Sequence, residues 1–183
     1  MRCDAPIHPM NKTLLLSRLQ NERDHFELLL NRVGFSRRLT LRGVSGGLTV
    51  KDLLAEILTH EQFIADRLSE VLHGWNYSPS ASFSALEAFQ AQFGYPDFES
   101  PLYQKGGHDL SVLDAYKNIE FDEIVAEELA LYSNILEFVK KLSHHQCLDH
   151  DLYHRVAEHT YRLYRRTGTM IERWLKQDTS ELK

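Results

Sequence analysis

Two histidines lie at positions where the sequence otherwise predicts the apolar faces of long helices. His60 follows Glu56 by four residues, so both side chains fall on the same side of a helix. His159 lies on the apolar face of a second periodic segment near the C-terminus. An imidazole titrates near neutral pH and suits proton transfer. We therefore take Glu56 or His60 as the candidate general acid or base, and His159 as the residue that orients substrate or water.

Two further carboxyl groups interrupt the apolar faces of other predicted helices, namely Glu22 and Glu128. Burial of such groups without partners is costly, so they must pair, bind a metal ion or line a wet cavity. Three interpretations stay open. The polar residues form a satisfied internal network without chemistry, or they form a catalytic or metal site on Glu56, His60 and His159, or they line a ligand pocket without metal.

Four long segments with apolar residues at i, i+3 and i+4 must position these side chains. They span about 11–33, 49–72, 121–142 and 149–176. Thr49 is a good N-cap for the second segment, and Gly74 is expected to end it. Helices of this length, each with one apolar stripe, suit an all-α four-helix bundle.

The predicted connections differ greatly in length. Residues 34–48 join the first two helices, whereas about 74–120 join the second and third and contain three of the five prolines. A short helix over Ser84–Phe93 is expected within this long connection. A link of that length is typical of a functional flap or a crossover. We predict an N-terminal tail over 1–10, with Met10 as an alternative start, and a single domain over 11–183.

Composition excludes several function classes. The 183 residues contain 21 Lys and Arg against 26 Asp and Glu, a net charge of −5, which gives no basic face for nucleic acid. No stretch approaches the ~18 apolar residues of a membrane span, and the first ten residues lack the apolar centre of a signal peptide. Two cysteines far apart are no disulfide framework. A cytoplasmic protein without nucleic-acid or membrane partners is expected.

Two segments of the sequence resemble a known family. They are Leu48–Glu61 (LTVKDLLAEILTHE) and Glu158–Leu175 (EHTYRLYRRTGTMIERWL). Together they are similar to the DinB/YfiT-like superfamily, and most closely to its ClbS/DfsB branch. The resemblance implies a DinB-like four-helix bundle with a long connection between helices two and three. It also implies activities of the kinds found in that superfamily, which include thiol-dependent transferases, isomerases and a hydrolase that confers resistance to a reactive metabolite.

The sequence departs from the family at its metal ligands. Metal-binding members place one histidine on helix two and two on helix four, where this chain has Glu56, Leu163 and Thr167. The resemblance therefore implies that the three-histidine site is lost and that no cofactor is expected. It also places His60 and His159 about one turn away, facing one cavity. If zinc or nickel binds, the ligands would be relocated to Glu56, His60 and His159.

These observations predict binding or detoxification of a small electrophilic molecule in a central polar pocket. Besides the three candidate catalytic residues, the predicted lining residues are Glu22, Glu128, Leu163 and Thr167. One alternative is a metal-dependent hydrolase or thiol transferase that uses the relocated ligands. Another is a non-enzymatic binding or structural protein, which acts through ligand sequestration or through formation of a homodimer.

Overall fold

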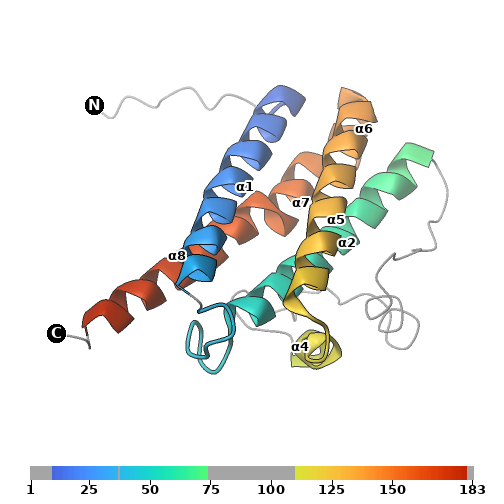
Figure 1. Ribbon diagram of the computed structural model, residues 1–183. Coiled ribbons are helices and arrows are strands. Elements are labelled where there is room, and N and C mark those ends of the chain that lie inside the picture. Colours follow the sequence, from blue (N-terminus) through green and yellow to red (C-terminus); the bar gives the residue numbers. More distant parts are fainter. Residues whose placement is uncertain (1–9, 37, 74–109, 181–183) are drawn as a thin grey trace, which may run out of the picture.

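The computed structural model describes residues 10–36, 38–73 and 110–180, most of which are helical (Figure 1). The helices in order are α1 (Lys12–Phe35), α2 (Val50–His73), α4 (Leu110–Tyr116), α5 (Phe121–Lys141), α6 (His144–Asp149), α7 (Leu152–His159) and α8 (Tyr161–Ser180). No strand occurs in these ranges, where Ser45 and Leu48 form an isolated antiparallel bridge. The predicted all-α class is confirmed for the described part of the chain.

The long helices pack in pairs around one apolar core. α2 packs along α5, α1 packs along α8, and α1 also contacts α5 (Figure 1). The interior faces repeat at helical spacing, as they do on α1, where the buried residues are Leu15, Leu19, Arg23, Phe26, Leu29 and Val33. Three of the four predicted helices are thus confirmed within two residues at each end.

Side chains close the ends of these helices. Thr49 and Asp52 form a reciprocal cap before α2: the Asp52 amide donates to the Thr49 hydroxyl at 3.1 Å, and the Thr49 amide donates to the Asp52 carboxylate at 2.8 Å. The Lys12 ammonium donates to the Lys140 and Leu142 carbonyls at the end of α5, where a cation is favourable. The predicted stop at Gly74 lies outside the described residues.

The single helix predicted over 149–176 is wrong. The structure divides this region into α7 and α8 at Thr160, whose backbone dihedrals of −131° and −102° are not helical. The Thr160 hydroxyl donates to the Val156 carbonyl, so this β-branched side chain competes with the backbone of its own helix. Asp151, before α7, adopts a left-handed conformation with φ of 51°. Apolar periodicity continues across the interruption, which explains why the pattern did not reveal it.

The region predicted as a long connection is described only at its end. There α4 packs on α2 and buries Val112 and Tyr116. The expected helix over Ser84–Phe93 lies outside the described residues, as does most of the predicted tail over 1–10. In the described part of the chain, no helix combines the length and apolarity needed to cross a membrane.

Two leucines on α1 test which face of this helix packs in the core and contributes to stability. Leu19 is fully buried, whereas Leu28 is 67% exposed. We expect Leu19→Ala to lower the free energy of unfolding by about 2–5 kcal/mol, because it leaves a cavity in the core. The control Leu28→Ala is expected to change it by less than about 0.5 kcal/mol. Urea unfolding measures both, and equal effects would contradict the assigned face.

Candidate functional site

His60 of α2 and His159 of α7 meet in the interior. Their Nδ1 atoms lie 2.8 Å apart, and each side chain is nearly buried. One imidazole therefore donates a hydrogen bond and the other accepts it. The Phe63 ring packs against His159, with ring centroids 4.9 Å apart. The expected juxtaposition of these two histidines is found, and it joins α2 to the end of α7.

Both imidazoles favour the neutral form. Burial lowers the pKa of His60 well below its usual value, and the neighbouring His159 and Arg166 lower it further. Burial also lowers the pKa of His159 to about 4; Glu158 opposes this shift, whereas Arg155 and His154 add to it. At neutral pH the pair is therefore uncharged, which is the state that a general base needs.

The other residues of the predicted catalytic and metal site are arranged differently. Glu56 lies one turn before His60 on α2 and is partly exposed. Across the described residues, no three His, Cys, Asp or Glu side chains gather in a way that could hold a metal ion. Glu56 therefore does not complete a three-ligand set with His60 and His159. Leu163 and Thr167 are buried on α8 and line neither pocket described below.

The interior position predicted for Glu22 is wrong. Glu22 lies at the edge of α1 and pairs with the exposed Arg165 of α8, whose hydrogen bond lowers the pKa of Glu22. The next residue, Arg23, points inward instead and is 4% exposed. Arg23 follows Leu19 by four residues, so it fits the buried stripe as well as Glu22 does.

Arg23 belongs to a buried polar cluster built from four helices, which we call the charge cluster: Arg23 (α1), Glu61 (α2), Glu128 (α5) and Tyr164 (α8). The Arg23 guanidinium donates to Glu128, and the Tyr164 hydroxyl donates to Glu61. Arg23 also lies over the ring of Tyr132, 5.6 Å from its centroid. The prediction that Glu128 is an interior carboxyl is confirmed.

The charge cluster holds two carboxyl groups and one cation. Burial raises the pKa of Glu61 well above its usual value, and the nearby Glu128 raises it further. Burial raises the pKa of Glu128 to about 7, although Arg23 opposes the shift. Burial therefore favours the protonated form of Glu61, and the Arg23 guanidinium pairs directly with Glu128.

Several polar atoms of the charge cluster lack a hydrogen-bond partner among the described residues. They are Nε and Nη1 of Arg23, Oε1 of Glu128 and Oε2 of Glu61. Buried polar atoms of folded proteins almost always bond to protein, ordered water or a ligand. The cluster can thus donate further hydrogen bonds from Arg23 and accept further ones at Glu128 and Glu61.

A pocket of about 410 Å³ borders the charge cluster between α1 and α5. Arg23 and Glu128 line it together with Glu27 and Asn31, and the remaining lining residues are Leu30, Gly34, Phe35, Leu39, Leu54, Phe121, Val125 and Leu129. Phe35 is 90% exposed at its edge. A mainly apolar wall with a few convergent polar groups is typical of a small-molecule site.

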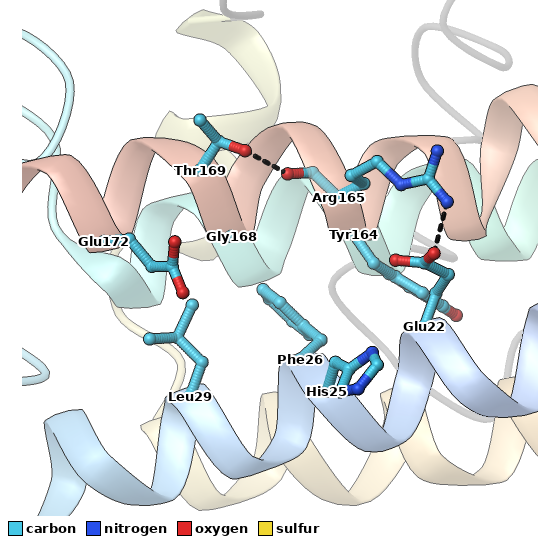
Figure 2. A pocket seen from close by; sticks show the side chains of 9 residues that line it. All are labelled: Glu22, His25, Phe26, Leu29, Tyr164, Arg165, Gly168, Thr169 and Glu172. Atoms are coloured by element: carbon cyan, nitrogen blue, oxygen red, sulfur yellow. Dashed lines mark hydrogen bonds and ion pairs between the residues drawn. The ribbon is translucent and has the colours of Figure 1, made fainter.

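A smaller pocket of about 160 Å³ lies between α1 and α8 (Figure 2). Glu22 and Arg165 pair at one side, and Phe26 stacks on Tyr164 with ring centroids 5.6 Å apart. Gly168 faces α1, and a Cβ there would lie at an ordinary contact distance of 3.5 Å from Leu29. Glu22 therefore lines a shallow pocket at the surface and not a central one.

Sequence reasoning missed Arg23, Glu61 and Tyr164 as members of one site. Tyr164 sits in a row of arginines and tyrosines typical of a packed edge beside a solvated face, and Glu61 directly follows His60. The available signal was Arg23, whose spacing from Leu19 and Phe26 places a cation on an apolar stripe. A buried cation requires a buried anion, and Glu128 was already expected inside.

Comparisons with known protein families, with curated proteins and with solved structures find no match for this chain. The assignment of a site therefore depends on the geometry above. The likeness of Leu48–Glu61 and Glu158–Leu175 to ClbS/DfsB proteins stays a prediction, as do the catalytic roles of Glu56, His60 and His159.

The lowered pKa values of the histidine pair predict how the free energy of unfolding depends on pH. Below pH 6.5 the unfolded chain takes up protons at His60 and His159 while the folded chain does not, so folding loses free energy as the pH falls. His60→Leu/His159→Phe removes this loss. Relative to the natural chain, the double variant should gain free energy of unfolding as the pH falls from 6.5 to 4, by up to about 3 kcal/mol from His159 and by a further amount from His60.

Urea unfolding at pH 7, 6, 5 and 4.5 measures this difference. All other ionisable groups are present in both proteins, so their titration cancels in the comparison. Parallel curves for the two proteins would contradict the burial of neutral histidines.

The charge cluster predicts that replacing Arg23 alone lowers the free energy of unfolding more than replacing Arg23 and Glu128 together. Arg23→Met leaves Glu128 buried without its cation and should lower the free energy of unfolding by about 3–5 kcal/mol at pH 7. Arg23→Met/Glu128→Leu removes both partners and should cost markedly less, because no buried carboxyl group is left without its partner. Urea unfolding of both variants measures this difference. A double variant as unstable as Arg23→Met would show that the pair is not coupled.

Proposed function

We propose that this chain is a DinB-like bundle protein of the ClbS/DfsB type that binds a small amphipathic molecule in the pocket between α1 and α5. The observation that carries the proposal is an apolar pocket of about 410 Å³ whose lining includes Arg23 and Glu128, two residues with buried polar atoms that lack a hydrogen-bond partner among the described residues. An apolar ligand body would contact the walls, and its polar end would reach the charge cluster.

His60, His159 and Glu56 are not among the described lining residues of this pocket, so proton transfer by them to a molecule bound there has no structural support. Sequestration of a small reactive molecule needs only the pocket. This function agrees with the resemblance to a family that includes a resistance protein.

Residue Gly34 offers a way to block the pocket without altering the charge cluster. It lines the pocket near the end of α1, and a Cβ at this position would meet Leu39 at an ordinary distance of 3.7 Å. Gly34→Leu should therefore fold and place its side chain in the space that the ligand needs. Leu28→Asn, on the exposed face of the same helix, is the matched control.

We expect at least one eight-carbon compound with a polar end to raise the melting temperature of the natural chain. At a free ligand concentration of 100 times Kd, binding adds about 2.7 kcal/mol to the free energy of unfolding, which raises the melting temperature by several degrees. Thermal melting with octanoate, octanamide, octylamine and 1-octanol measures this. Gly34→Leu should abolish the shift and Leu28→Asn should keep it. A shift that persists in Gly34→Leu would place binding elsewhere, and no shift with any compound would contradict the proposed function.

A further inference from the structure

We infer that the polar end of the ligand is a carboxylate, which binds Arg23 and shares one proton with Glu128. This inference deepens the proposed function and rests on it. It identifies the ligand class as a monocarboxylate with an apolar body.

Arg23 supplies the donors. Its side chain is more than nine-tenths buried, and it donates through one terminal nitrogen to Oε2 of Glu128. Its Nε and other terminal nitrogen carry N–H groups that meet no acceptor among the described residues. A guanidinium forms its strongest hydrogen bonds with carboxylate oxygens. An incoming carboxylate would therefore satisfy donors that the protein leaves unused.

Glu128 supplies the place for a proton. Its Oε1 has no hydrogen-bond partner among the residues described, and its carboxyl group is 1% exposed. Two ionised carboxylates beside one cation would repel each other. A proton held by Glu128 removes this repulsion and turns Oε1 into a donor toward the ligand. The ligand arrives as an anion, the proton comes from water, and no covalent bond breaks.

The groups around Glu128 identify it as the residue that takes up the proton. It faces Arg23 and Glu27 of α1, Glu61 of α2 and Tyr164 of α8, with Tyr132 one turn along α5. Burial raises the pKa of Glu61 well above its usual value, which favours its protonated form. Burial also raises the pKa of Tyr132 to about 12 and that of Tyr164 well above its usual value. The pKa of Glu128 is about 7, so protonation costs little at neutral pH and progressively more above it.

Other polar ends fit these groups less well. An ammonium would add a second cation beside Arg23 and leave the unused N–H groups without acceptors. An amide can accept from Arg23 and donate to ionised Glu128, so it binds without proton uptake and without charge attraction. A hydroxyl group presents one uncharged oxygen where a carboxylate presents two charged ones. It therefore satisfies the unused N–H groups of Arg23 less fully than a carboxylate does.

Isothermal titration of the natural chain with octanoate, octanamide and octylamine between pH 6 and 9 tests the inference. These probes share one apolar body and differ in the polar end, and octanoate stays ionised over this range. At pH 6.5 we expect octanoate to bind at least about tenfold more tightly than octanamide, as a charge-assisted contact should. Its Kd should rise about tenfold per pH unit above pH 7, because each binding event then takes up one proton.

Glu128→Gln separates proton uptake by Glu128 from a merely structural role, because only proton uptake links this residue to the pH dependence of octanoate binding. The amide of glutamine resembles a permanently protonated glutamate, so octanoate should bind this variant with a Kd that stays constant from pH 7 to 9. Octanamide binding as tight as octanoate binding, or octanoate binding independent of pH in the natural chain, would overturn the inference but leave the proposed function intact. If no eight-carbon compound binds, both the proposed function and the inference are wrong.

Discussion

The burial of one cation between two carboxyl groups constrains the whole interior of this protein. Arg23, Glu61 and Glu128 come from three different helices and are each at most 4% exposed. The desolvation of such groups costs several kcal/mol for each charge, which only close contact and proton retention offset. The relative positions of α1, α2 and α5 are therefore set by charge compensation as well as by apolar packing. Tyr164 adds α8 to the same constraint through its hydrogen bond to Glu61.

The protein has two buried polar contacts with different electrostatic characters. The histidine pair joins α2 to α7 and is uncharged at neutral pH, because burial lowers both pKa values. The charge cluster keeps one cation whose compensation depends on a carboxyl group that titrates near pH 7. His60 and Glu61 are adjacent in sequence, yet they serve different contacts, since neighbouring helical residues point about 100° apart. One turn of α2 thus contributes to both.

Much of the fold could be predicted from the sequence, and the reason is physical. A helix that buries one face must repeat apolar residues every three or four positions, so α1, α2 and α5 were predicted nearly to their ends. The same repeat correctly predicted that His60, His159 and Glu128 lie in the protein interior. It could not separate Glu22 from Arg23, because both lie within one turn of Leu19 and the choice depends on the anion across the core. It also could not reveal the break at Thr160, where a hydroxyl group redirects the backbone without altering the pattern of apolar residues.

The interruption at Thr160 has a consequence for the motion of the C-terminal region. α7 spans only Leu152–His159, so its amide hydrogens are protected by few helical hydrogen bonds, and helix ends open at the lowest free energy. α8 is longer and packs along α1 as well as on α7, so we expect its central amides to exchange more slowly than those of α7. His159 is the last residue of α7, and its contact with His60 holds the less protected segment onto α2. The imidazole pair therefore adds a polar contact between α2 and the end of α7, beside the apolar packing of α7 on its neighbours.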